Sequence, residues 1–279
     1  MKILVIGASN VDIIAKSNSK IILNDSNPGG HVIAFGGVGR NLAIDLAILG
    51  NQVTFITPLS QDSFGLMMIK ETKKYGIELV GPKTNKSSIY LSIQDSSGDL
   101  HCAVSSMKSI DKITPDNLKK FIGVNNQYDI IICETNINVD SIKFISELDH
   151  PFKIVELVSS EKSIKAKNFL DGFNLVKGNK KEIHNLLGLS DPKKLYEKKF
   201  QFDILMTQGK KDAFYISKNI SSYSFKETES VNTSGAGDAF LAGFISGLSN
   251  ENPLKKGHES AIRALMSETS YIKVDKWSK

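Results

Sequence analysis

The sequence predicts an α/β protein whose parallel-sheet core lies between layers of helices and carries a small inserted β-sheet lid. Short apolar runs rich in β-branched residues alternate with amphipathic stretches through most of the chain, which is typical of parallel strands joined by helices. Two stretches, 11–35 and 88–105, break this alternation because each has the pattern of strand and turn with no helix between. These observations predict the fold class.

Six apolar runs supply the expected core strands. Each is short and rich in isoleucine, valine or leucine, as strands that are buried on both faces require. The runs cover 3–6, 53–56, 129–133, 153–157, 173–176 and 203–207.

Two of the helices expected between these strands carry end signals. From Arg40 to Gly50 the apolar side chains recur on one face, and Gly50 supplies a C-terminal stop. Thr114 is placed to cap a second helix, which has Pro115 in its first turn. Both patterns predict helices that begin and end at defined residues.

The two irregular stretches predict a lid. The stretch 88–105 alternates and contains the turn D-S-S-G-D, so it is expected to form a hairpin. Because no linker, repeat or low-complexity tract appears, we expect 11–35 and 88–105 to form one small sheet inserted into a single domain that spans 1–279. The open edge of so small a sheet is compatible with a homodimer that pairs two lids, although the sequence does not determine the assembly.

Charge and cysteine content bound the partners and the compartment. The net charge of +5 comes from 35 basic and 30 acidic residues spread along the 279-residue chain, which does not indicate a nucleic-acid partner. Cys102 and Cys133 lie far apart in apolar surroundings, so we expect packing residues in a reduced compartment. A strand beginning beside Met1 leaves no room for a targeting segment, and no apolar run reaches membrane-spanning length, so we expect a soluble cytoplasmic protein.

The stretch V-N-T-S-G-A-G-D-A-F at 231–240 places three small residues before an acid and a helical apolar pattern. Small residues at a helix N-terminus leave unpaired backbone N–H groups open to an anion. Asp238 then has two interpretations. An acid in the first turn stabilises a helix by about 0.3–1 kcal/mol, or it accepts a proton from a hydroxyl while the amides hold the charge on a transferring phosphoryl group.

A second motif, A-F-G-G-V-G-R-N-L-A at 34–43, places paired glycines ahead of a helix whose first turn carries Asn41. Gly36 and Gly37 allow a polyol to approach the backbone closely, and the Asn41 amide is free to bond its hydroxyls. Simple turn geometry is the alternative explanation of the glycines.

Together the two motifs resemble those of the carbohydrate and nucleoside kinase family that includes ribokinase, and the resemblance covers nearly the whole chain. It implies a ribokinase-like fold, ATP and Mg²⁺ as cofactors, and Asp238 as the catalytic base. It also implies that the turn amides of Gly235, Ala236 and Gly237 stabilise the transferring group. The sugar-binding positions implied by the resemblance are Asn10, Asp12, Gly36, Gly37, Asn41 and Glu134.

The resemblance also implies a nucleotide site. The family's N-x-x-E motif, associated with magnesium and phosphate, matches Asn179 to Glu182, with Glu182 acting on Mg²⁺ through water. The same pair has the pattern of a capping box, and both interpretations are compatible. Asp12 likewise has a simpler interpretation as a turn residue at a strand end. The nucleotide-binding positions are Asn179, Thr207, Gly209, Gly235 and Gly237.

Two positions depart from the family pattern. Asn232 stands where the family usually has an aspartate associated with a monovalent cation, which argues against activation by such a cation. Gly178 replaces a proline common before the N-x-x-E asparagine. The stretch 258–267 corresponds to the region that closes over adenine, and no residue is assigned there.

Four segments resemble those of bacterial pseudouridine kinases within that family, namely 25–29, 36–41, 87–92 and 231–238. The first and third lie in the expected lid, where substrate identity is set, so Ser88 is added to the substrate-binding residues. The resemblance implies ATP-dependent phosphorylation of the 5′-hydroxyl of pseudouridine. Pseudouridine exposes a ring N–H that uridine lacks, and we expect its acceptor near 24–27 or 87–88.

Three alternatives remain. A kinase of the same fold could act on ribose, on another nucleoside such as uridine, or on a sugar phosphate, although the lid offers few basic residues for a second phosphate. A non-catalytic sugar sensor is disfavoured because Asp238 is retained with its full turn. A dinucleotide-dependent oxidoreductase is disfavoured because no G-x-G-x-x-G follows the first strand.

Overall fold

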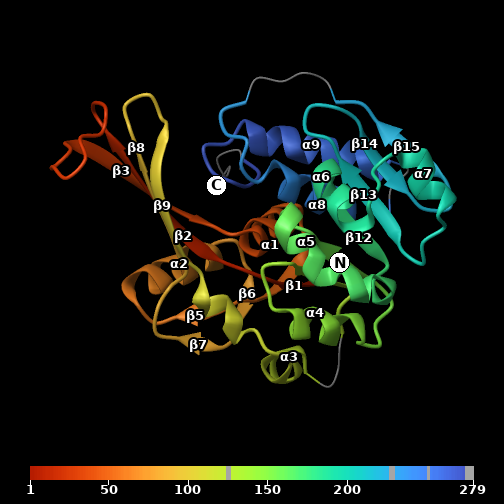
Figure 1. The fold of residues 1–279 in the computed structure, drawn as a ribbon. Coiled ribbons are helices and arrows are strands. Elements are labelled where there is room, and N and C mark those ends of the chain that lie inside the picture. Colours follow the sequence, from red (N-terminus) through yellow and green to blue (C-terminus); the bar gives the residue numbers. More distant parts are fainter. Residues whose placement is uncertain (124–126, 226–229, 250–251, 274–279) are drawn as a thin grey trace, which may run out of the picture.

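The computed structural model describes residues 1–123, 127–225, 230–249 and 252–273. Within these residues, nine strands form one large sheet in the order β15-β14-β13-β12-β11-β10-β1-β4-β6 (Figure 1). The pairs from β6 to β13 are parallel, and β14 and β15 are antiparallel additions at one edge. The strands are β1 (Lys2–Ile6), β4 (Gln52–Ile56), β6 (Glu78–Val80), β10 (Ile130–Glu134), β11 (Lys153–Glu156), β12 (Leu175–Asn179), β13 (Asp203–Thr207), β14 (Ala213–Ile216) and β15 (Ile220–Tyr223).

Helices cover both faces of the large sheet. Along β1, Ile3 and Val5 pack into one core cluster while Leu4 and Ile6 pack into the other, because successive side chains of a strand point to opposite faces. One cluster includes side chains of α1 (Val38–Ile48), α8 (Ala236–Ser246) and α9 (Pro253–Leu265). The other includes side chains of α3 (Pro115–Ile122), α4 (Val139–Ser146), α6 (Lys180–Leu187), α7 (Pro192–Glu197) and η2 (Ile164–Gly172). The predicted α/β/α core is confirmed.

Local signals in the sequence place the helix ends. Thr114 Oγ1 accepts a hydrogen bond from the Asn117 amide, and Pro115 occupies the first position of α3, as predicted. Gly50 follows the end of α1 with a φ of 86°, so it is the expected stop. The remaining elements are α2 (Ser63–Lys73), α5 (Ser160–Ser163), η1 (Lys108–Lys112) and the short strands β5 (Leu59–Ser60) and β7 (Lys83–Thr84).

A second sheet of four strands projects away from the helices (Figure 1). Its order is β3-β2-β8-β9, with β2 parallel to β8 and the two outer pairs antiparallel. The β8–β9 pairing confirms the predicted hairpin. The strands are β2 (Asn10–Ser17), β3 (Gly29–Gly36), β8 (Ile89–Gln94) and β9 (Leu100–Ser106).

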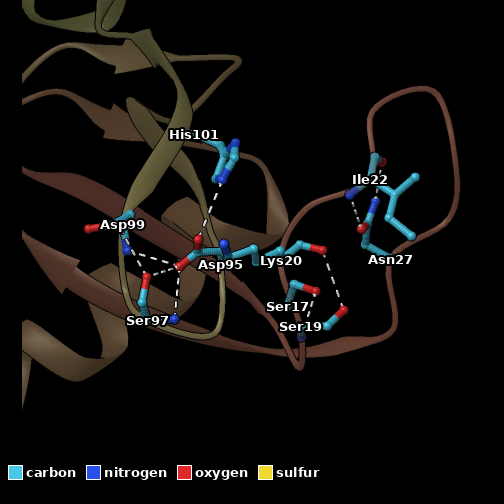
Figure 2. A network of polar contacts seen from close by, with 9 residues as sticks. All are labelled: Ser17, Ser19, Lys20, Ile22, Asn27, Asp95, Ser97, Asp99 and His101. Carbon is cyan, nitrogen blue, oxygen red and sulfur yellow. Dashed lines mark hydrogen bonds and ion pairs between the residues drawn. The ribbon is translucent and has the colours of Figure 1, made fainter.

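Side chains at the tip of the second sheet organise its two loops (Figure 2). Asp95 accepts hydrogen bonds from the backbone amides of Ser97 and Asp99, which closes the β8–β9 turn. In the other loop Asn27 exchanges two hydrogen bonds with the Ile22 backbone, at 2.8 and 2.9 Å. These Asp and Asn side chains take the place of backbone partners in the loops.

The prediction that both cysteines are packing residues is wrong for one of them. Cys133 is buried in β10, but Cys102 is exposed on β9. Every residue of β9, an edge strand of the small sheet, is exposed. Among the described residues, no helix is long and apolar enough to cross a membrane.

Candidate active site

Two cavities meet at the N-terminus of α8. The larger cavity, of about 780 Å³, is lined by residues of the second sheet, the start of α1 and the turn 234–238. The smaller cavity, of about 200 Å³, is lined by the end of β13 and by α8 and α9. Gly237 lines both cavities. Among the described residues, Gly237 is the one that lines both cavities, so groups bound in the two can approach each other at this turn.

The turn before α8 depends on Gly235. Its φ is 77°, a left-handed conformation that glycine adopts without strain, and an ideal Cβ there would overlap the Ser270 carbonyl oxygen. No side chain on the helix caps the first turn. The backbone N–H groups at the start of α8 therefore face the cavities as a site for negative charge.

Asp238 is buried in the first turn of α8, on the wall of the larger cavity. Its Oδ2 accepts a hydrogen bond of 3.0 Å from the Asn41 side-chain amide. Burial raises the pKa of Asp238 to about 6, although Lys177 and the Asn41 bond oppose the rise. A carboxyl with this pKa is poised to accept a proton near neutral pH.

Asn41 lies where α1 starts beside the second sheet. Gly37, with a φ of 101°, precedes α1, and an ideal Cβ on it would lie only 2.5 Å from the Ala8 carbonyl oxygen. Among the described residues, the buried Asn41 Oδ1 has no hydrogen-bond partner. Because a buried acceptor without a partner is costly, this atom is suited to bond a ligand hydroxyl in the larger cavity.

The structure brings Asn10 and Asp12 to the same cavity from β2. Asn10 Nδ2 donates to Asp12 Oδ1 at 2.6 Å, and burial raises the pKa of Asp12 despite this bond. Gly36 does not appear among the described lining residues. It lies across the strand pair, where an ideal Cβ would come within 2.5 Å of Asp12 Oδ2, so it makes room for that carboxylate.

Glu134 lies beneath the larger cavity instead of on its wall. Its carboxylate accepts hydrogen bonds from the backbone amides of Ala8 and Asn136, both of which line the cavity. Burial raises the pKa of Glu134 to about 7 against these bonds. Glu134 therefore fixes the backbone of two residues that line the cavity.

Ser88 lines the larger cavity at the start of β8. Its hydroxyl lies 2.5 Å from that of Ser109 in η1, so the hydrogen bond ties the second sheet to the body of the protein. Met107, between β9 and η1, also lines the cavity.

The smaller cavity combines polar and apolar walls. Thr207 and Gly209 line it at the carboxyl end of β13, where ligands bind in parallel sheets. Its apolar wall includes Phe225 and Phe240, whose rings stack with centroids 5.9 Å apart. Ile262 and Leu265 of α9 complete that wall, but nothing in their sequence pattern distinguishes them from core residues.

Asn179 and Glu182 form the predicted capping box. Glu182 Oε2 accepts from the Asn179 backbone amide at 2.7 Å, and Oε1 accepts from its side chain at 2.6 Å. Neither residue appears among the described residues lining the two cavities. Each oxygen of the Glu182 carboxylate keeps a further lone pair. No cluster of three metal-ligating side chains occurs in the described ranges. The arrangement fits Mg²⁺ held mainly by phosphates and water.

Asn232 precedes the same turn. Its Oδ1 accepts from the Ser234 amide at 2.9 Å, so the side chain is used within its own loop.

Sequence reasoning missed several lysines. Lys108, Lys162 and Lys165 line the larger cavity from η1 and the segment after β11. Lys162 donates to the Asn136 side chain, and Lys165 donates to two backbone carbonyls. Within the described part of the chain, neither amine lies within 4 Å of a carboxylate oxygen. Nothing in the sequence separates these three from the other lysines, most of which are solvated.

A buried ion pair was also missed. Lys177 Nζ lies 2.8 Å from Glu156 Oε1, and both side chains are almost fully buried. The pair lies near Asp238, whose pKa Lys177 lowers.

The chain is similar to several known proteins. Residues 1–264 match the family model of the pfkB family carbohydrate kinases. Pseudouridine kinase of Escherichia coli K12 is 29% identical over 261 residues, which cover 88% of this chain and 82% of that protein.

Solved structures give the same fold. A carbohydrate kinase from Agrobacterium tumefaciens superposes with a TM-score of 0.84 at 23% identity, over 96% of this chain and 92% of its own. Ribokinase from Thermotoga maritima superposes with a TM-score of 0.76 at 17% identity, over 96% and 94% of the two chains. The predicted ribokinase-like fold is confirmed.

Proposed function

We propose, from the premise that this chain belongs to the pfkB family of carbohydrate kinases, that it transfers the γ-phosphoryl group of ATP to the 5′-hydroxyl of pseudouridine. The family makes it a phosphotransferase acting on a sugar or nucleoside. The observation that carries the proposal is the meeting of the two cavities at Gly237, beside Asp238. The larger cavity takes the acceptor and the smaller one takes ATP.

The residues of the larger cavity orient the acceptor. Asp12 and Asn41 bond the ribose hydroxyls, and the backbone at Gly37 lets the ribose come close. The free Asn41 Oδ1 supports this role because it lacks a partner in the described residues. Holding the 5′-oxygen in line with ATP removes much of the entropic barrier to reaction.

Asp238 accepts the proton of the 5′-hydroxyl as the phosphoryl group transfers. The turn amides from Gly235 to Asp238 hold the charge that develops on that group. Magnesium, when bound, neutralises charge on the phosphates, with Glu182 acting through water. Asn232 lacks the charge that a monovalent cation prefers, so we propose no activation by such a cation.

The second sheet acts as a lid in this proposal. Closing over the acceptor excludes water, which otherwise competes for the phosphoryl group. Its exposed apolar side chains, such as Val32 and Val104, support pairing of two lids in a homodimer.

Recognition of pseudouridine requires an acceptor for its extra ring N–H. The expected region 24–27 lies at the lid tip, where Asn27 bonds its own loop. Ser88 of the other expected region, 87–88, lines the larger cavity. The described residues that line this cavity include three carboxylates, Asp12, Asp111 and Asp238, of which Asp12 and Asp238 already have roles, so we propose that Asp111 accepts this N–H. Uridine lacks this N–H and would forgo the hydrogen bond to Asp111, which is exposed, so the expected preference for pseudouridine is modest.

One observation favours a second candidate function. Lys108, Lys162 and Lys165 give the larger cavity a basic wall that comes from the body of the protein and not from the lid. An acceptor that already carries a phosphate, such as fructose 6-phosphate, would suit that wall.

The deciding experiment measures ADP release with ATP and Mg²⁺ and compares pseudouridine, uridine, ribose and fructose 6-phosphate at equal concentrations. Turnover on pseudouridine well above the others is expected. Faster turnover on another acceptor would keep the kinase and overturn the pseudouridine assignment. Turnover on none would shift weight to an untested acceptor or to a sugar sensor.

A further inference from the structure

Lys177 lies directly behind the turn that the two cavities share. Its side chain on β12 is almost fully buried, and its ammonium donates to Glu156 of β11 at 2.8 Å. An ideal Cβ built on Gly237 would come within 3.2 Å of Lys177 Nζ. The small residue in the turn therefore lets a positive charge approach the transfer point from behind.

Acidic groups surround this ammonium and Asp238. Three carboxyl groups interact electrostatically with Asp238, namely Glu156 from β11, Glu182 from α6 and Asp45 from α1. The Asn41 side-chain amide donates a hydrogen bond to Asp238. Among the described residues, Lys177 from β12 is the cation that acts on Asp238 and Glu156, and Arg263 from α9 acts on Asp45. Burial alone lowers the pKa of Lys177, but the neighbouring carboxylates outweigh burial and raise it, so the ammonium stays charged.

A purely structural role accounts poorly for this pair. Desolvating two charges offsets most of their attraction, so a buried ion pair contributes little net stability. Moreover, Glu156 Oε2 is buried without a partner among the described residues.

We propose that Lys177 is a positioning residue for phosphoryl transfer, which holds Asp238 in its proton-accepting form and places a fixed positive charge behind the turn amides. The inference rests on the proposed role of Asp238 as the base. Glu156 holds the ammonium in place. Its negative charge also weakens the electrostatic effect of the ammonium on Asp238.

The test titrates the Asp238 carboxyl directly. Carbon-13 NMR of the full protein, labelled at aspartate carboxyls and assigned with Asp238→Asn, follows its protonation without requiring turnover. In Lys177→Met the titration should move up by about one pH unit or more, because an attracting charge is lost. In Glu156→Gln it should move down, because the ammonium is left free to act on Asp238.

The pH dependence of kcat supplies a second readout, measured with the acceptor that the wild type uses fastest. The acid limb should move to higher pH in Lys177→Met and to lower pH in Glu156→Gln. Lys177→Met should also lose at least about tenfold in kcat at pH 7, mostly because the positive charge behind the turn amides is lost. The double variant Lys177→Met/Glu156→Gln removes both charges together and controls for folding.

An Asp238 titration that stays in place in folded Lys177→Met would overturn the proposal. If Lys177→Met does not fold, the proposal is overturned when the Asp238 titration in Glu156→Gln stays in place or moves to higher pH. Failure of the proposed function looks different, because the wild type would then turn over another acceptor faster than pseudouridine, or none of the acceptors, while the Asp238 carboxyl still titrates.

Discussion

The side-chain amide of Asn41 donates to Asp238 Oδ2 at 3.0 Å, although the two residues are 197 positions apart. The packing of α1 against α8 brings them together, and each belongs to one of the two motifs that the sequence singles out. One hydrogen bond thus couples the acceptor-binding motif to the proposed base.

The activity should have an acid limb near pH 6. The pKa of Asp238 is raised from the ordinary aspartate value to about 6, so the carboxylate that accepts the proton is present above that pH and is lost below it. The limb appears in kcat/KM measured from about pH 3 to pH 9. A limb near pH 4 would show that Asp238 does not limit the reaction.

Replacement of Asp238 by asparagine should lower kcat by about 10²–10⁴-fold, the usual contribution of a general base. ATP affinity should change little, because the smaller cavity is intact. Single-turnover kinetics and calorimetry separate the two effects. Asp191→Asn is the matched control, since Asp191 caps the distant helix α7. Retention of most of the turnover in Asp238→Asn would remove this residue from the role of base.

Asn41→Ala should lower kcat/KM by about 10–100-fold, as expected for loss of a hydrogen bond to a charged group. The hydrogen bond from Asn41 lowers the pKa of Asp238 in the wild type, so its loss should raise that pKa and move the acid limb to higher pH. Asn51→Ala is the control. Asn51 links the end of α1 to Ser246 of α8, so its loss weakens the same helix pair far from the cavities. Equal effects on kcat/KM in the two variants would argue for a structural role of Asn41.

Gly235→Ala should destabilise the protein by more than about 3 kcal/mol, because the new Cβ meets the Ser270 backbone. Gly188→Ala provides the comparison, since Gly188 also has a positive φ, 75°, but has open space around its Cβ position. That variant should cost about 1–2 kcal/mol. Urea unfolding measures both, and similar values would mean that conformation alone accounts for Gly235.

Asp45→Asn should stabilise the protein at alkaline pH. Asp45 is fully buried on α1, and one oxygen accepts from the Ile272 amide. Burial raises its pKa well above the ordinary value of 3.8, so its stabilising contribution is complete below that value and is lost as the pH rises through the raised pKa. Thermal unfolding should show a higher Tm for the variant at pH 8 and a smaller difference at pH 5. A difference that does not change with pH would contradict this.

Much of the fold follows from short-range patterns. The β-branched runs, the cap at Thr114 and the capping box at Asn179 depend on residues a few positions apart, so they can be recognised along the chain. The small residues before α8 can also be recognised from a short stretch of sequence. The alternation of strands and helices then places this stretch at the carboxyl edge of a parallel sheet.

Other features depend on contacts between distant segments. Glu134 has the position in sequence of a ligand contact, but the backbone of Ala8 covers its carboxylate. Cys102 has an apolar neighbourhood in sequence but lies on the exposed edge strand β9. In both cases another part of the chain decides whether the side chain is exposed.

The sequence by itself determined the fold class, several helix ends and the two motifs that meet at Asp238, because these depend on local periodicity and turn chemistry. Only the tertiary structure decided that Lys177 lies behind the turn and that Lys162 and Lys165 line the larger cavity. The identity of a lysine in the sequence does not indicate whether its side chain is buried or which groups it contacts. Its burial and its partners are set by the strand register and by segments that lie far away along the chain.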